Sequence, residues 1–109
     1  MSEISIEDFT KLDLRIVEVT KVDRIPGKSK ILKVEVDLGR GEKREVVIGG
    51  GGFYEPSFFV GRKMVFLGNL QPKMIAGVES RGMLLAADVE GKPYWLQVEQ
   101  EVPPGSKVR

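Results

Sequence analysis

The side chains that could do chemistry in this chain are limited to carboxylates, hydroxyls and amines, because cysteine and histidine are both absent. Their absence excludes thiol nucleophiles, imidazole bases, disulfides and zinc or haem sites built on sulfur or nitrogen side chains. The acidic residues are scattered, each near a lysine or arginine, and form neither an acid/base pair nor a metal cluster. We therefore expect no enzymatic activity and no bound cofactor or metal.

Four consecutive glycines, Gly49 to Gly52, invite comparison with phosphate-binding loops. Such loops need a Gly-Lys-Ser or Gly-Lys-Thr after the glycines, or the spacing GxGxxG, and neither pattern is present. We therefore interpret the run as a place where the chain passes close to another backbone or takes a positive φ angle, since both favour glycine.

Positive charge is concentrated in two segments, although the formal net charge is only +1. Residues 21–34 carry five basic side chains and one acidic, and residues 62–81 carry four and one. Because a polyanion binds to a local basic surface, these segments predict a nucleic-acid face. The alternative is that they are solvated strand edges carrying ordinary lysines.

Short alternating runs predict the strands that must position these charges. Residues 32–38 alternate between apolar and charged side chains, which is typical of a strand with one buried and one solvated face. Residues 44–48 follow as a hairpin partner after a turn at 39–41, and residues 14–22 alternate with slips of phase that predict a bulged, bent strand. Further strands are expected at 63–70, 83–88 and 94–98.

Two short helical segments complete the expected elements. Ser5 to Asp8 form a variant capping box that predicts one helical turn, and residues 54–60 carry Pro56 where a first turn tolerates proline. Five or six strands with a small helix between the third and fourth predict an all-β fold, a five-stranded OB-fold barrel, in one domain over residues 1–109. An SH3-like barrel is the competing architecture.

The run from Asn69 to Ala87 is the most distinctive part of the chain, and it reads NLQPKMIAGVESRGMLLAA. It resembles the run NLKPRKLRGVESQGMLLAA of a tRNA-binding OB-fold family. Members of that family occur as the C-terminal part or β-subunit of methionyl-tRNA synthetase and as freestanding tRNA-binding proteins. Further matches extend over nearly the whole chain, at 8–9, 11–15, 34, 37–39, 54–56 and 60–63.

The resemblance implies that a homodimer binds tRNA by its structure, beside a methionyl-tRNA synthetase or as its β-subunit. The basic side chains that we expect to capture tRNA are Lys28, Lys30, Lys33, Arg44, Lys73 and Arg81. The family's matching positions imply that Ser80 and Asn69 hydrogen-bond a phosphate or an exposed base, and that Met83 lies against an unstacked base. The basic cluster is thinned, because Gln71, Met74 and Ala76 stand where the family often has basic residues.

Several aromatic residues need their own interpretation. Phe53, Phe58 and Phe59 are too many for one short helix to bury, so we expect them to form a dimer interface. The other aromatic residues considered lie within apolar strand runs and are Phe66, Tyr94 and Trp95. These rings could serve as stacking platforms for bases, but we favour burial in the core or an interface, since buried aromatic rings dominate small cores.

Two other functions stay open at this point. Chaperones of the CsaA type share this fold and much of its pattern; the thinned basic cluster favours a chaperone, whereas the intact run Gly77 to Ala87 favours tRNA. A pure assembly domain within a synthetase complex fits the same observations. The N-terminus has no basic segment followed by an apolar run, and no stretch could span a membrane, so we expect a cytoplasmic protein without a membrane partner.

Overall fold

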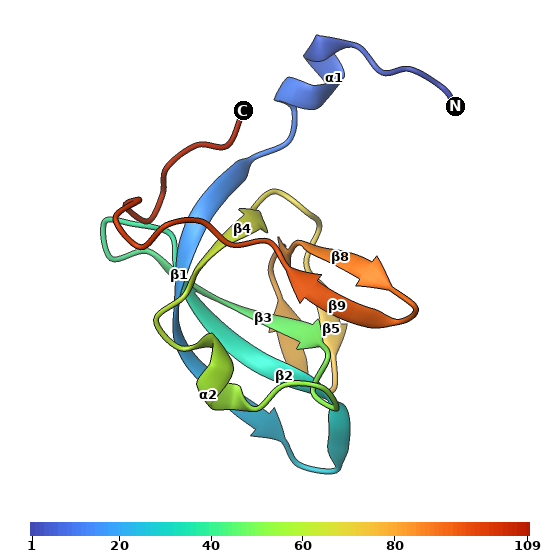
Figure 1. Cartoon of the computed structure of the whole chain (residues 1–109), viewed down its shortest axis with the longest axis vertical. Coiled ribbons are helices and arrows are strands. Elements are labelled where there is room, and N and C mark those ends of the chain that lie inside the picture. The colour runs from blue at the N-terminus through green and yellow to red at the C-terminus, as the bar shows by residue number, and fades with distance from the viewer.

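Five strands form the main sheet of the computed structural model, which describes residues 1–109 (Figure 1). They are β1 (Leu14–Ile25), β2 (Lys28–Asp37), β3 (Lys43–Gly49), β4 (Lys63–Leu67) and β7 (Met83–Leu84). Their order is β3-β2-β1-β4-β7, and every neighbouring pair is antiparallel. Two further hairpins stand apart from this sheet, β5 (Lys73–Ile75) with β6 (Val78–Ser80) and β8 (Ala86–Val89) with β9 (Lys92–Trp95).

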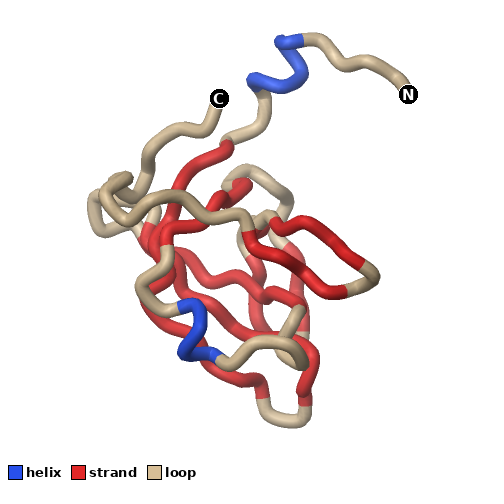
Figure 2. Tube along the Cα trace, viewed as in Figure 1, coloured by secondary structure: helices blue, strands red, loops and turns tan.

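Two short helices lie outside the strands, as Figure 2 shows. Helix α1 (Ile6–Thr10) precedes β1 and is capped as predicted, since the Ser5 hydroxyl accepts a hydrogen bond from the Asp8 N–H at 3.0 Å. Helix α2 (Pro56–Phe59) lies between β3 and β4 and begins with Pro56. This order of elements confirms the predicted all-β OB-fold. Neither helix is long and apolar enough to cross a membrane.

The first strand bends so that it can pair with two partners. Its first part, Leu14–Glu18, pairs with β4, and the stretch from Glu18 onward pairs with β2. The register with β2 shifts between Val19 and Lys21, which marks a β-bulge, and bulges bend the strand that carries them. The predicted bulged strand is confirmed, and it extends to Ile25.

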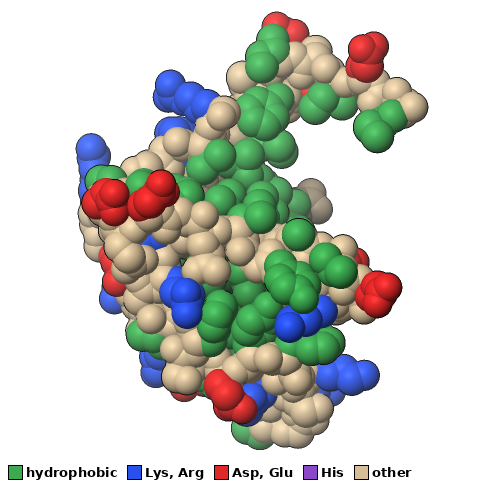
Figure 3. Space-filling model, in the orientation of Figure 1, with side chains coloured by type: hydrophobic (Ala, Val, Ile, Leu, Met, Phe, Trp, Pro, Cys, Tyr) green, Lys and Arg blue, Asp and Glu red, His purple; other side chains and the backbone are tan.

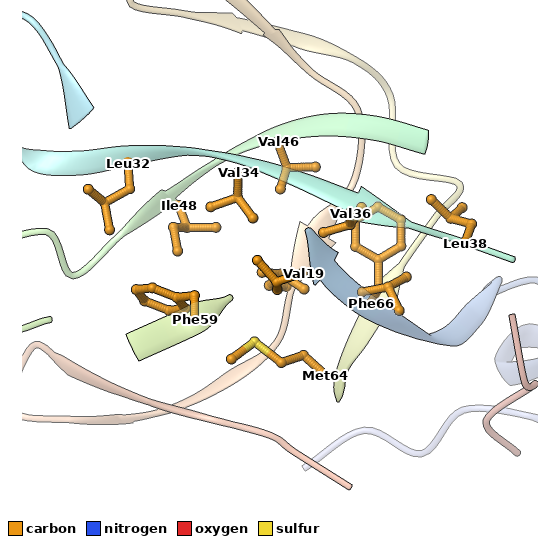
Figure 4. Packing of buried hydrophobic residues seen from close by; sticks show 12 residues of the cluster. Val19, Leu32, Val34, Val36, Leu38, Val46, Ile48, Phe59, Met64 and Phe66 are labelled. Carbon is orange, nitrogen blue, oxygen red and sulfur yellow. The ribbon is translucent and has the colours of Figure 1, made fainter. Parts of the chain in front are cut away.

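The core is formed by apolar residues that alternate along the strands of the curved sheet (Figure 4). The chain adds Phe59 of α2 to this core at the end near Ile48, while Met64 and Phe66 of β4 fill the rest of it. Because the Phe59 side chain is 0% exposed, the prediction that it belongs to a dimer interface is wrong. A single helical turn is enough to direct this ring into the barrel.

Several predicted strand boundaries need correction. The expected strand at 63–70 ends at Leu67, the expected strand at 83–88 is divided between β7 and β8, and the last strand begins at Lys92. The segment expected as a loop contains the β5–β6 hairpin. Its two turn residues, Ala76 and Gly77, have φ angles of 51° and 81°, as a tight two-residue hairpin turn requires.

The glycine run lies against the beginning of β2. A Cβ at Gly51 would lie 2.9 Å from the Ser29 carbonyl oxygen, and Gly50 has a φ of +87°. The predicted close backbone approach is therefore confirmed at Gly51, and the predicted positive φ is confirmed at Gly50.

Candidate nucleic-acid interface

The outer face of the β2–β3 hairpin has mixed charge. Its residues alternate with those that enter the core, and the register places Lys33 opposite Val47 and Glu35 opposite Glu45. The Lys33 ammonium lies 3.8 Å from a Glu45 carboxylate oxygen, and Lys43 lies 3.7 Å from Glu35. Lys33, a predicted tRNA contact, is therefore partly neutralised by its cross-strand neighbour.

Basic side chains without an acidic partner lie at the borders of this face. Lys28 and Lys30 lie at the β1–β2 turn, Lys73 lies on β5, and Arg81 follows β6. All four are exposed, and none takes part in an ion pair. The structure thus leaves these four of the six predicted basic contacts free to meet phosphate.

Ser80 attaches the β5–β6 hairpin to the edge of β3. Its side chain is 6% exposed, and its hydroxyl oxygen accepts a hydrogen bond from the Val47 N–H at 3.0 Å. The Arg81 N–H donates to the Glu45 carbonyl at 3.1 Å. Because the hydroxyl is enclosed, Ser80 does not have the predicted direct contact with RNA. Instead, it positions the hairpin that carries Lys73.

Arg44 points toward one end of the barrel interior. It lies opposite the buried Val36, and its guanidinium donates to the Gly68 carbonyl at 2.6 Å and to the Glu42 carboxylate at 3.2 Å. Its donors therefore stabilise the chain after β4, and the prediction that Arg44 captures tRNA is corrected.

Asn69 also uses its side chain within the protein. Its amide oxygen accepts from the Asp13 N–H at 2.9 Å, and its amide nitrogen donates to the Lys11 carbonyl at 2.6 Å. These two bonds hold the segment between α1 and β1 against the chain after β4. Both polar atoms of the exposed side chain are paired within the protein, so its predicted contact with a base or phosphate would have to use the remaining N–H or lone pair.

Two methionines present apolar surface beside the basic border. Met83 is exposed on β7, as its predicted contact with an unstacked base requires. Met74, on β5, is 64% exposed, whereas the sequence marks it only as a departure from the family pattern. Its position on β5 was the missing information, since this strand lies outside the main sheet and exposes both Met74 and the preceding Lys73.

The predicted aromatic dimer interface is not a single surface. Phe58 is half-buried under the Arg62 guanidinium, whose central carbon lies 3.9 Å from the ring centroid. Of the three phenylalanines, Phe53 alone is widely exposed, at 57%.

A second apolar surface, not predicted from the sequence, lies at α1. This helix has no buried residue, and Ile6 is 67% exposed. A groove of about 550 Å³ separates α1 from the C-terminal residues and is lined in part by Ile6, Phe9, Leu12 and Val108. The spacing of Ile6 and Phe9, three residues apart on one helical face, was the available signal.

A small ion cluster ties the C-terminal segment to the beginning of β1. One Asp13 carboxylate oxygen accepts from the Arg15 side chain at 2.9 Å and from the Lys107 ammonium at 3.2 Å. The Arg15 hydrogen bond lowers the pKa of Asp13, and Lys107 lowers it further against the opposing effect of burial. The same contact raises the pKa of Arg15. Asp13 is therefore held as a carboxylate in a structural cluster.

Comparison with known protein families agrees with this arrangement of a small OB-fold with a basic border. Residues 14–107 match the family described as a putative tRNA binding domain, and the chain belongs to this family. The predicted resemblance is confirmed.

Among curated relatives, the chain is similar to two methionine–tRNA ligases. It is 41% identical over 105 residues to the enzyme of Caldanaerobacter subterraneus, and the aligned region covers 96% of this chain and 16% of that enzyme. It is 46% identical over 110 residues to the enzyme of Methanocaldococcus jannaschii, covering 100% of this chain and 17% of that enzyme. The chain thus spans about a sixth of the length of these relatives.

Two solved structures resemble the whole chain. The MetRS-related protein from Pyrococcus horikoshii has a TM-score of 0.94 and 37% identity, and the match covers 100% of both chains. The chaperone CsaA from Bacillus anthracis has a TM-score of 0.88 and 29% identity, covering 99% of this chain and 100% of that one. The fold therefore occurs in proteins described by two different functions.

Proposed function

We propose that this chain is a noncatalytic module that binds tRNA through its structure, beside a methionyl-tRNA synthetase or as its β-subunit. The observation that carries the proposal is the set of four unpaired basic side chains at the borders of the β2–β3 face, Lys28, Lys30, Lys73 and Arg81. Free cations release counterions from RNA when they meet its phosphates, and this release drives binding. Membership of the tRNA-binding family supports the same function.

The distribution of charge favours contacts at two separate places on the RNA. The centre of the outer face carries Glu35 and Glu45, each close to a lysine, whereas unpaired cations lie at the β1–β2 turn and along the edge of β3. Carboxylates repel phosphates, so the RNA backbone would be held at the borders and not along the centre. A separation of this kind selects for the shape of a folded RNA.

The benefit to a synthetase would be a higher effective concentration of tRNA. A second, weaker contact on the same tRNA increases the overall affinity without any change in the active site. This role requires no chemistry from the module itself.

The proposal is tested by measuring the affinity for bulk tRNA at several salt concentrations. The variants Lys28→Gln, Lys30→Gln, Lys73→Gln and Arg81→Gln should each weaken binding and each lower the salt slope by about one. Arg40→Gln is the matched control, because Arg40 is also exposed and unpaired but lies at the β2–β3 turn. Equal effects of all five variants would contradict the proposed face.

A CsaA-like chaperone that binds unfolded polypeptide is the second candidate. The exposed side chains of Met74 and Met83 favour it, because flexible methionines adapt to varied apolar partners. The likeness to the Bacillus anthracis chaperone supports it as well. If the wild-type chain suppressed aggregation of an unfolded protein but did not retain tRNA, this function would replace the first.

We further propose that the chain forms a homodimer through the surface between α1 and the C-terminal residues. A five-residue helix is too short to be stable in water by itself, and α1 buries none of its side chains. Ile6, Phe9 and Val108 line the groove beside it. A second copy of α1 would cover this apolar groove and stabilise the helix in the same step.

A further inference from the structure

One lysine lies among three aromatic rings on the surface formed by the glycine run and the β8–β9 hairpin. The Lys92 ammonium is 5.0 Å from the ring centroid of Tyr94, 5.7 Å from that of Tyr54 and 5.9 Å from that of Phe53. Phe53 and Tyr94 are 57% and 47% exposed, so solvent reaches these two rings. Figure 3 shows apolar side chains with a basic side chain among them on this face.

One side-chain hydrogen bond crosses between the two segments, and two backbone hydrogen bonds close the turn of the glycine run. The Tyr54 hydroxyl donates to the Pro93 carbonyl at 2.7 Å, and the backbone N–H groups of Phe53 and Tyr54 both donate to the Gly50 carbonyl. A Cβ at Gly50 would lie 2.8 Å from the Pro93 ring, so a larger residue there would push the segments apart. These contacts hold the backbone of the glycine run against the β8–β9 hairpin without any ligand.

The same glycine run connects this surface to the free lysines of the β1–β2 turn. The Gly51 N–H donates to the Lys30 carbonyl at 3.0 Å, and Gly51 is buried against the Ser29 backbone. The run thus joins the segment that carries Lys28 and Lys30 at Gly51, two residues before Phe53. This arrangement explains why glycine stands at positions 50 and 51 without a phosphate-binding loop.

We propose that Phe53 and Tyr94 form a stacking site for an unpaired base of the bound tRNA, with Lys92 pairing with the adjacent phosphate. The inference rests on the proposed tRNA binding and adds a contact outside the basic border of the β2–β3 face. Exposed aromatic rings stack on any base, and a neighbouring cation meets the phosphate that accompanies it. We name this surface, made of Phe53, Tyr94 and Lys92, the aromatic site.

The charges around the aromatic site favour a nucleotide over an apolar peptide. An ammonium group lies within reach of both exposed rings, so the surface is positively charged where an apolar side chain would have to bind. At the far end of the hairpin, Asp88 of β8 and Glu90 of the β8–β9 turn are exposed and repel phosphate. The RNA strand would therefore continue from the aromatic site toward Lys28 and Lys30, where the cations are unpaired.

Two substitutions separate base stacking from general apolar contact. Phe53→Leu and Tyr94→Leu keep an apolar side chain but remove the ring, and each should weaken binding of fluorescein-labelled bulk tRNA about ten-fold with an unchanged salt slope. Phe53→Trp should retain binding, and Lys92→Gln should lower the slope by about one. Val89→Ala is the matched control, since Val89 is an exposed apolar residue without a ring on the same hairpin. Thermal unfolding of every variant verifies that the fold is intact.

Photocrosslinking gives a direct second readout. A tRNA transcript containing 5-iodouridine, irradiated in complex with the wild-type chain, should yield crosslinked peptides that contain Phe53 or Tyr94. The inference would be overturned if the wild-type chain bound tRNA, both leucine variants bound it with the same affinity, and no such crosslink formed. The proposed tRNA binding would then remain in place. Failure of the wild-type chain to bind tRNA would remove both. Equal weakening of tRNA binding by Phe53→Leu and Val89→Ala would assign the effect to general apolar contact and overturn base stacking.

Discussion

The hydroxyl of Ser80 accepts a hydrogen bond from the backbone N–H of Val47 at 3.0 Å, across the junction between the β5–β6 hairpin and the outer edge of β3. This bond caps a donor that an edge strand would otherwise leave unpaired. It also determines where the side chain of Lys73 lies, because Lys73 is opposite Ser80 in the hairpin. One enclosed hydroxyl thus connects the stability of the barrel to the position of a free cation.

Ser80→Ala should destabilise the protein, because the Val47 N–H loses its partner in a place that water hardly reaches. We expect a loss of about 1–3 kcal/mol in the free energy of unfolding. Urea denaturation followed by the fluorescence of the single tryptophan measures it. Ser57→Ala, at an exposed serine of α2, is the control and should change stability very little. Equal stability of the two variants would contradict the positioning role.

Glu45→Gln should strengthen the binding of tRNA. The substitution removes a negative charge from the outer face and releases Lys33 from its neighbour at 3.8 Å. We expect an increase in affinity of about three-fold at low salt and a steeper salt dependence. Glu101→Gln changes the net charge equally at an exposed, unpaired position in the C-terminal segment. If both variants gain equally, only the net charge matters and the β2–β3 face is not the site.

Arg44→Ala should affect stability and leave the salt slope of tRNA binding unchanged. The Gly68 carbonyl and the Glu42 carboxylate lose the donors that reach them at 2.6 and 3.2 Å. The free energy of unfolding should fall by about 1.5–3 kcal/mol, as for hydrogen bonds to charged groups. Lys43→Ala, on the outer face of the same strand, should cost less than about 1 kcal/mol. A reduced salt slope in Arg44→Ala would restore its direct role in capture.

Stability should fall in acid partly through Asp13. Its pKa is lower in the folded protein than in the unfolded chain, chiefly because Arg15 hydrogen-bonds the carboxylate. The resulting stabilisation is complete above the unfolded pKa of about 4 and is lost as the pH falls from there through the lower folded pKa. Asp13→Asn should be less stable than the wild type at neutral pH and should lose less stability below about pH 4. Thermal unfolding across this pH range measures both effects.

Ile6→Asp should convert the proposed dimer into a monomer, because a carboxylate in an apolar interface lacks a partner. Sedimentation equilibrium at micromolar concentration should give twice the chain mass of 12.1 kDa for the wild type and the single mass for the variant. Phe53→Asp places the same charge on the other exposed apolar surface and should remain dimeric. If only Phe53→Asp lost the dimer, the interface would lie at the glycine run, as predicted from the sequence.

Strand faces could be predicted where the alternation is regular. Residues 32–38 alternate without a break, and their inward and outward faces are those observed. The same rule applied to β3 places Arg44 on the face of Val46 and Ile48, which is the inner face. The contiguous apolar run that ends β3 obscured this phase, so Arg44 was interpreted as a surface cation.

Contacts between distant segments could not be predicted from patterns. The bond between Ser80 and Val47 joins residues 33 positions apart and depends on how the β5–β6 hairpin lies against β3. The pairing of Lys33 with Glu45 depends on the exact register and on side-chain conformations. The burial of Phe59 depends on the direction in which one helical turn faces the barrel. Each of these contacts depends on how separate segments pack together, and the alternation of residues within one segment does not predict that packing.

The position of the two termini has a consequence for attachment to a larger enzyme. Both chain ends emerge at one pole of the longest molecular axis, and the β1–β2 turn with Lys28 and Lys30 lies at the other pole (Figure 1). A polypeptide fused to either end would be tethered at the pole remote from these lysines. Such a tether leaves the lysine pole unobstructed, so one module can be joined through its first residue or its last without covering the end that we propose to bind phosphate.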